Sequence, residues 1–332
     1  MPARDDSAFD PRLVLAALLR DEDEAGAAAE DSGLAAEQLA AWRDRLIEAG
    51  LAVLDPAAEE SRWVQADLAF DGSASQYQRL VASPLPDRLS AWCREGTATN
   101  AWHLHKPPGV RLRLEGDARR LENLLAPLLD DLVVTGAVTG WRFGVYLPET
   151  HLFGGPVGMR LAHQFFTADS LAVLAYHHAR QQASASLSPA EFSFLLLDGL
   201  LARLVADPWE RWDVWCRLKW TGRVLDDAGG PAPPGPGAAA WVRAVRSFPG
   251  PWPGASRREQ AILAEYHQRV LALAETTAAA LHQGESAANL RRSLPFWIVF
   301  HWNRMLFSIE AQRSLTRAVV AGLDPRGPAT GG

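Results

Sequence analysis

The spacing of hydrophobic residues divides the chain into three parts. In residues 11–54, leucines recur at helical spacing in two segments, which are separated by the acidic, alanine-rich stretch DEDEAGAAAEDSG. This pattern predicts a small helical module over residues 1–58. Two helices followed by LAVLD and RWVQADLAF are typical of a winged helix. Such a module binds DNA, a partner or a peptide, or serves for packing alone.

Residues 62–150 show mostly two-residue alternation, which is typical of strands with one buried face. The turn KPPG separates two of these strands, because its prolines and glycine cannot continue a helix or a central strand. Leucines at helical spacing over 117–136 predict a helix that Asp117 caps and Pro127 bends. The expected strands are RWVQADLAF, AWHLH, VRLRLEG and GWRFGVYLPE, which together form a mostly antiparallel sheet.

The pattern after Gly154 is helical. The stretch GGPAPPGPG at 229–237 is too rich in proline and glycine for regular structure, so it predicts an exposed loop or hinge. We therefore expect an α+β fold with a small antiparallel sheet in its first half, a largely helical second half and the N-terminal helical module. The expected helices span 156–166, 169–184, 189–206, 208–226, 238–247, 256–282 and 294–321.

Composition narrows the classes of function that the chain could have. With 332 residues, of which 48% are hydrophobic, the chain can bury a full core without disulfides. The charge is mildly negative, −6 from 33 basic and 39 acidic residues, and no block of basic residues is present, which argues against nucleic acid as a partner. Cys93 and Cys216 are too few for a disulfide framework or a structural zinc site, so we expect a reducing cytoplasm and no metal.

The N-terminus and the tryptophans add two further points. MPARDDSAFDP is acidic where a secretory signal would be basic, and no apolar run approaches the roughly 18–20 residues that cross a bilayer. We therefore expect neither export nor a membrane partner. The 13 tryptophans suit core packing, but they also suit grooves that hold peptides or planar ligands, and composition does not distinguish the two.

Common cofactor and hydrolase motifs are absent: no GxGxxG, GxxxxGK[ST], HExxH or GxSxG occurs. Polar clusters remain. The first lies on the two arms of the hairpin around KPPG, where alternation puts His103 and His105 on one face of their strand and Arg111 and Arg113 on one face of theirs. A basic strip of this kind could grip carboxylate or peptide carbonyl groups. The alternative is a solvated outer face.

Two other clusters stand in the helical half. The string VYLPETHLFGGPVGMRLAHQFFTADS has Glu149 at a strand exit and Asp169-Ser170 in the arrangement of a helix cap. Further on, FWIVFHWNRMLFS interrupts an apolar helix with His301, Asn303 and Arg304. Polar groups in so apolar a stretch are paired in the core or line a cavity, because unpaired burial would cost several kcal/mol. The pattern alone favours neither.

These stretches, taken in order, resemble a known family. RWVQADLAF, AWHLHKPPGVRLRLEG, the string from Tyr146 to Ser170 and HWNR are similar to the thiopeptide-type bacteriocin biosynthesis domain. That family is related to the C-terminal, glutamate-eliminating domain of class I lanthipeptide dehydratases. The resemblance covers roughly residues 62–322. It implies a catalytic domain over 59–326, with the module over 1–58 as a candidate leader-peptide contact.

The resemblance implies two competing activities. Eliminating members carry a histidine before RLR, in a stretch such as GGPHLRLR, whereas this chain reads KPPGVRLR. The Lys-Pro-Pro-Gly form looks more like the stand-alone pyridine synthases, which join two dehydroalanines of a precursor peptide by a formal aza-[4+2] cycloaddition and release the leader. We expect the cyclase. A split glutamate-elimination enzyme and a non-catalytic peptide-recognition protein are the alternatives.

The implied partner is a modified precursor peptide with its leader, and a homodimer is a candidate assembly. The reaction needs no cofactor and no metal. By resemblance, the catalytic residues are His301, Asn303 and Arg304. Tyr266, one of four tyrosines, is a candidate general acid, although its spacing alone favours a core or surface tyrosine. The candidate substrate-binding residues are His105, Lys106, Arg111, Arg113, Tyr146 and Glu149.

Overall fold

The chain divides into two compact units, residues 1–62 and 63–332. The computed structural model describes residues 41–45, 62–72, 74–221, 239–243, 252, 254–282 and 290–326. In the first unit, residues 41–45 are helical. The remainder of the expected winged helix, and with it the candidate leader contact, lies outside the described residues. The second unit contains the sheet and the helices that follow it.

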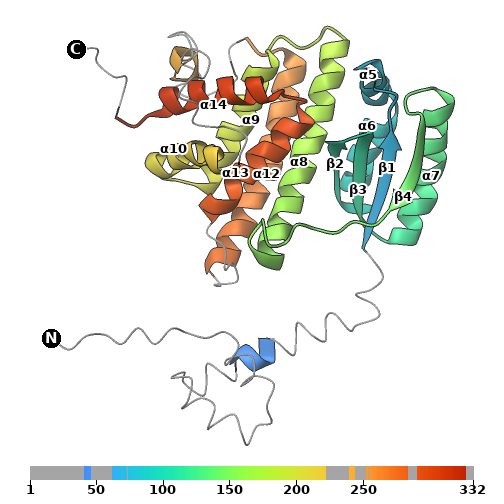
Figure 1. The fold of residues 1–332 in the computed structure, drawn as a ribbon, viewed down its shortest axis with the longest axis horizontal. Helices are drawn as coiled ribbons and strands as arrows, with labels where there is room; N and C mark the ends of the chain where they lie inside the picture. Colours follow the sequence, from blue (N-terminus) through green and yellow to red (C-terminus); the bar gives the residue numbers. More distant parts are fainter. Residues whose placement is uncertain are drawn as a thin grey trace, which may run out of the picture. The chain divides into compact units, whose positions relative to one another are not determined.

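The four predicted strands are confirmed and form one antiparallel sheet. They are β1 (Trp63–Ala69), β2 (Ala98–Lys106), β3 (Gly109–Gly116) and β4 (Gly140–Gly144), in the order β2-β3-β1-β4 (Figure 1). The turn KPPG joins β2 to β3, and β3 runs next to β1 from Gly109 to Glu115. The order leaves β2 and β4 as the two edges of the sheet.

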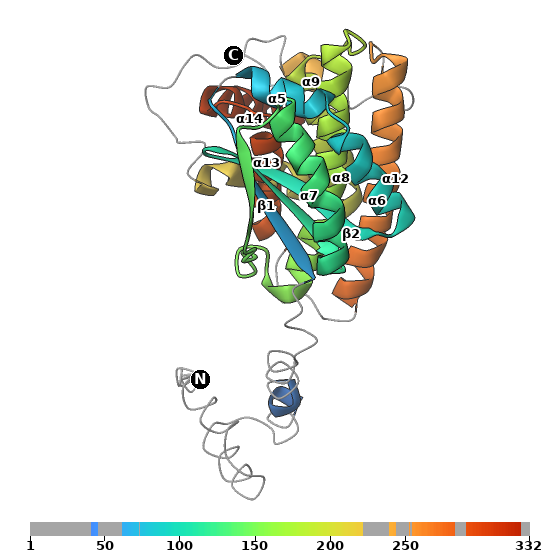
Figure 2. The ribbon, with the colours of Figure 1, turned by 90° about the vertical axis from the view of Figure 1, so that its right-hand side faces the viewer.

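One face of the sheet is covered by three helices: α5 (Ala74–Ala82), α6 (Leu85–Glu95) and α7 (Ala118–Val134). Val64, Ala66, Leu112 and other alternate strand residues pack against them in one hydrophobic core. Figure 2 shows α6 and α7 lying across this face. Asp117 caps α7 as predicted, since its side chain accepts a hydrogen bond from the amide of Arg120. The sequence analysis missed α5 and α6.

The helical half stands beside β2 (Figure 1). Its longest helices, α8 and α12, contact each other along much of their length, and both belong to a second hydrophobic core. This core also takes in Trp102 of β2. The helices are α8 (Gly155–Gln181), α9 (Pro189–Leu204), α10 (Pro208–Cys216) with a 3-10 turn at Arg217–Thr221, α12 (Arg257–His282), α13 (Leu290–Arg304) and α14 (Ile309–Leu323).

Two expectations about these helices are wrong. Asp169 and Ser170 do not cap a helix; they lie in the middle of the continuous α8, and both are buried. The expected helix 294–321 is two helices, because the backbone turns at Leu306, whose φ is +59°. Ser308 then caps α14 by accepting a hydrogen bond from the amide of Ala311.

The first residue of β3 has no room for a side chain. A Cβ on Gly109 would lie 2.1 Å from the carbonyl oxygen of Leu68, because β3 approaches β1 closely at this point. Gly140, at the start of β4, has nothing within 4 Å of the corresponding position. Gly109 therefore fixes how tightly the hairpin packs on β1.

We expect Gly109→Ala to lower the free energy of unfolding by about 1–3 kcal/mol, because the clash forces the strands apart. Gly140→Ala is the matched control, since it adds the same methyl group to a strand in open space. Urea denaturation of both variants measures the difference. Equal stabilities would contradict the close packing at Gly109.

Candidate functional site

The free edge of β2 is completed by side chains from α8 and α13. Asn303 binds both backbone groups of His105: its amide oxygen accepts from the His105 N–H at 2.8 Å, and its amide nitrogen donates to the His105 carbonyl at 2.9 Å. In α8, Thr167 and Ser170 accept from the amides of Ala101 and His103, each at 3.1 Å. These side chains take the place of a neighbouring strand.

Arg304 connects this edge to a fully buried ionic cluster. Its Nε donates to the His103 carbonyl and its Nη1 to a carboxylate oxygen of Asp169, both at 2.9 Å. The other oxygen of Asp169 lies 2.6 Å from His301 Nδ1, and His301 Nε2 lies 2.8 Å from the Ser193 hydroxyl. The side chains of Asp169, His301 and Arg304 are 0% exposed.

Asp169 supplies the negative charge of this cluster. Burial alone would raise the pKa of Asp169, but His301 and Arg304 offset this through charge and hydrogen bonds and hold the pKa below its ordinary value. Thus His301, Asn303 and Arg304, which the resemblance assigned to catalysis, all make side-chain hydrogen bonds inside the structure, although Arg304 Nη2 is buried without a partner. Their visible role is to hold the helical half on β2.

A second guanidinium group, that of Arg113, lies on the sheet face that α5, α6 and α7 do not cover. It stands 4.5 Å from the ring of Trp102 and 4.2 Å from that of Tyr146. Its Nε donates to Gln65 at 2.8 Å, whereas its Nη1 is buried without a partner. Arg304 lies 5.6 Å from the same Trp102 ring. Trp102 therefore joins the buried cluster to this polar face.

Tyr146 and His163 form a neutral pair beside Arg113. The Tyr146 hydroxyl lies 2.7 Å from His163 Nε2. Burial raises the pKa of Tyr146, and burial together with the charge of Arg113 lowers the pKa of His163 to about 3. Trp63 packs against both rings, with centroid distances of 5.1 and 4.3 Å. Nearby, one carboxylate oxygen of Glu149 is buried and has no partner.

A basic groove of about 420 Å³ opens at the other end of this face. Lys106, Arg111 and Arg142 line it together with a single carboxylate, Asp67. The two carboxylate oxygens of Asp67 lie 3.6 Å from Nε of Arg111 and 3.6 Å from Nε of Arg142. The positive charges exceed the negative one by two, so the groove suits an anionic group.

The expected single basic strip on the hairpin is only half right. Arg111 and Arg113 do share a face, but the register pairs Arg113 with Trp102 and Leu112 with His103. His103 and His105 therefore point to the opposite face, because neighbouring residues of a strand alternate. There the His105 ring packs on Tyr77, which also contacts His177. His105 is thus placed away from the other candidate substrate-binding residues.

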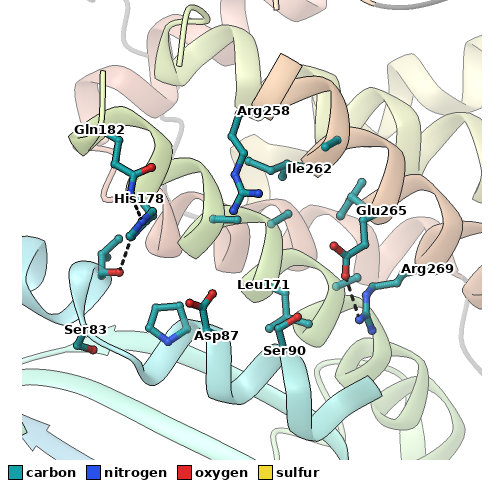
Figure 3. A pocket seen from close by; sticks show the side chains of 17 residues that line it. Ser83, Asp87, Ser90, Leu171, His178, Gln182, Arg258, Ile262, Glu265 and Arg269 are labelled. Carbon is teal, nitrogen blue, oxygen red and sulfur yellow. Dashed lines mark hydrogen bonds and ion pairs between the residues drawn. The ribbon is translucent and has the colours of Figure 1, made fainter. Parts of the chain in front are cut away.

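Tyr266 is separated from the polar face as well. It lines a cavity of about 320 Å³ between α6, α8 and α12. Figure 3 shows Arg258 and Asp87 pointing into this cavity from opposite sides. The Tyr266 hydroxyl is buried without a partner; burial raises its pKa, and the charge of Asp169 adds to this. It therefore lies within electrostatic reach of the buried cluster.

The structure thus gathers Arg111, Arg113, Tyr146 and Glu149 on one polar face, with Lys106 at its rim. Five other residues of this face were not predicted as site residues: Trp63, Gln65, Asp67, Arg142 and His163. The alternation in RWVQADLAF had already placed Trp63, Gln65 and Asp67 on one side of their strand. His163, a lone polar ring in the apolar LAHQFF, was the one available signal for a paired group.

Metal and membrane sites are not found in the described part of the chain. Among these residues, no group of three or more histidine, cysteine or carboxylate side chains is placed to hold a metal ion. None of the helices over the same residues is long and apolar enough to cross a bilayer.

Comparison with known proteins gives the family. Residues 63–322 match the family of lantibiotic biosynthesis dehydratase C-terminal domains, so the chain belongs to it. Among solved structures, the tRNA-dependent lantibiotic dehydratase MibB from Microbispora sp. 107891 is similar in fold, with a TM-score of 0.53 and 18% identity. That match covers 80% of this chain and 28% of the MibB chain. No curated protein matches. The resemblance of the sequence to a dehydratase-related domain family is confirmed.

The buried histidines predict that the protein loses stability in mild acid. Burial lowers the pKa of His105 and His163 to about 3 and that of His177 to about 4, with neighbouring positive groups adding to the effect. Unfolded histidine has a pKa of about 6.5, so below that pH the unfolded chain takes up protons that the folded chain does not. Each histidine then removes up to about 1.4 kcal/mol per pH unit.

We therefore expect the urea midpoint to fall steadily between about pH 6.5 and pH 4. His177→Gln should flatten this profile by the equivalent of about one proton. His151→Gln, at an exposed position, is the control and should leave the profile unchanged. A wild-type midpoint that is constant from pH 7 to pH 5 would contradict the neutral, buried state of these rings.

Proposed function

We propose that the protein is a pyridine synthase that catalyses a formal aza-[4+2] cycloaddition between two dehydroalanines of a ribosomally made precursor peptide. The family membership supports an enzyme of ribosomal peptide biosynthesis that acts on a precursor with a leader. The cycloaddition is our proposal for the reaction within that class. In it, the amide before one dehydroalanine tautomerises to an iminol, which supplies the azadiene that reacts with the second alkene.

One observation carries the proposal. The polar face holds a buried donor without a partner, Arg113 Nη1, and a buried acceptor without a partner, an oxygen of Glu149. An amide undergoing tautomerisation needs both, since its nitrogen gives up a proton while its oxygen gains one. In the proposal, Glu149 takes the proton from nitrogen and the neutral pair of Tyr146 and His163 supplies one to oxygen. Arg113 stabilises the negative charge that develops on that oxygen.

Aromatic residues on the same face suit the substrate. Trp63 is half-buried and packs on the edge of the Tyr146 ring, so the polar face is bordered by aromatic side chains. Planar azoles of a modified peptide stack well on such rings. Holding two distant alkenes together would convert a large loop closure into a step between bound groups, which lowers the barrier by several kcal/mol.

Gly109 supports cyclisation over elimination. In the stretch GGPHLRLR expected of eliminating members, the histidine stands at the position of Gly109 in KPPGVRLR. A Cβ at that position would lie 2.1 Å from the Leu68 carbonyl oxygen. The hairpin of this chain therefore has no room for the histidine that the eliminating pattern carries.

Glutamate elimination is the second candidate, and the basic groove favours it. Lys106, Arg111 and Arg142 against the single Asp67 suit the carboxylates of a glutamyl group. In both candidate reactions, His301, Asn303 and Arg304 are proposed as positioning residues. They act through β2 and Trp102 on Arg113, because Asn303 and Arg304 bond to the backbone of β2 and His301 bonds to Asp169.

Mass spectrometry separates the candidates. The full chain is incubated with a dehydrated, thiazole-containing precursor peptide and with its glutamylated counterpart. The cyclase is expected to release the leader and a macrocycle from the first, whereas elimination would lower the mass of the second by one glutamic acid. An intact leader, with the precursor unchanged in mass, would overturn the cyclase.

The polar face predicts which variants lose turnover. Glu149→Gln and Arg113→Lys should each lower kcat by about 100-fold, because the first removes the proton acceptor and the second the fixed donor fork. Glu122→Gln and Arg119→Lys, at exposed positions of α7, are the matched controls and should retain full kcat. Steady-state kinetics on the dehydrated precursor measures all four. Full activity of Glu149→Gln with a native fold would remove Glu149 from the mechanism.

A further inference from the structure

The two edges of the sheet differ. Side chains of α8 and α13 complete β2, as described above. No described strand pairs with the outer edge of β4, which ends the order β2-β3-β1-β4. An open edge presents backbone N–H and C=O groups in a row and accepts a further extended chain.

Exposed hydrophobic residues continue from this edge. Of the ten large hydrophobic residues that are exposed in the described chain, three follow one another at alternate positions: Phe143 is 37% exposed, Val145 81% and Leu147 77%. Arg142 precedes Phe143 in β4 and points to the opposite face, because strand neighbours alternate, and Tyr146 lies between Val145 and Leu147. Tyr146 is buried in the proposed site, whereas the Arg142 side chain is 81% exposed.

These side chains define the kind of peptide that would pair with the edge of β4. On one face, the new strand would place apolar residues beside Phe143, Val145 and Leu147. On the other, it would place an acidic residue beside Arg142, where the only described carboxylate within ion-pair distance is Asp67. The edge therefore fits a peptide with alternating apolar and acidic residues, which matches it in both burial and charge.

We propose that a segment of the precursor peptide adds to β4 as a fifth strand and so is guided into the site. This inference rests on the proposed function. The precursor peptide is the expected occupant because of where the chain goes next: from the end of β4 it leads through Val145 to Tyr146 and Glu149 within five residues. A peptide paired along the edge would reach the polar face without leaving the surface. Backbone pairing gives affinity, and the alternating side chains give specificity.

The test uses a fluorescein-labelled ten-residue peptide with glutamate and valine at alternate positions. A second peptide has the same composition in an order without alternation. Fluorescence anisotropy with the full chain measures Kd. We expect the alternating peptide to bind at least ten times more tightly than the other one. Equal affinities would overturn the proposal.

Variants locate the binding edge. Val145→Asn combined with Leu147→Asn should weaken binding of the alternating peptide at least tenfold. The matched control is Val133→Asn combined with Val134→Asn, because these residues are 38% and 85% exposed and belong to α7, not to β4 or the segment that follows it. It should change Kd by less than twofold. Arg142→Gln should also weaken binding and reduce its dependence on salt. Equal losses in both double variants would overturn a specific edge.

Hydrogen exchange identifies the occupant. The β4 amides that do not bond to β1, together with those of Val145 and Leu147, should gain protection only when the alternating peptide is bound. If these outer amides are already protected in the free protein, the chain itself or a second copy covers the edge, and the proposal is overturned. Self-association that the double variant abolishes without changing Kd would overturn it in the same way. Turnover of the dehydrated precursor with unchanged KM in this double variant would overturn docking but leave the cyclase standing. Binding of the alternating peptide, with no change in the mass of the dehydrated precursor, would overturn the cyclase but leave docking standing.

Discussion

The paired backbone of β2 is the constraint on which the rest of the second unit depends. A strand edge that faces a helical core cannot keep bare N–H and C=O groups, since each unpaired group would cost about 1–3 kcal/mol. Asn303 satisfies His105 in both directions, and Arg304 satisfies His103 while binding Asp169. The helical half is therefore attached to the sheet by directed hydrogen bonds as well as by hydrophobic packing.

This attachment also sets the geometry of the polar face. Trp102 of β2 lies between two guanidinium groups, with Arg304 on the side of the core and Arg113 on the side of Tyr146. The position of Arg113 thus follows from that of β2, which follows from α13. Removing one member of a buried ion pair costs about 3–5 kcal/mol, so a change at Asp169 or Arg304 would disturb the site through the fold. Loss of activity in such a variant does not by itself identify a catalytic group.

The sequence predicted the local structure better than the long-range contacts. Alternation identified all four strands, and Asp117 was correctly assigned as a cap, because both depend on neighbours in the chain. Asp169 and Ser170 were misassigned because their partners, Arg304 and the amide of His103, are distant in sequence. Spacing likewise placed His103 and His105 on one face of their strand and Arg111 and Arg113 on one face of theirs. It could not give the register between the two strands, which puts the histidines and the arginines on opposite faces of the sheet. The pairing of Tyr146 with His163 depends on packing and left no periodic signal.

The asymmetry between the two sheet edges links fold and chemistry. Because side chains of α8 and α13 complete β2, the docking proposal assigns an extended peptide to the edge of β4, from which the chain leads on to Tyr146 and Glu149. In the proposed function this face holds a flexible peptide with planar azoles, so it gains from a rigid support on one side and open access on the other. The buried cluster supplies the rigid side, since fixed donors need no reorganisation when charge develops. Access then requires an edge that proline does not block, and the segment from Trp141 in β4 to Leu147 beyond its end contains no proline.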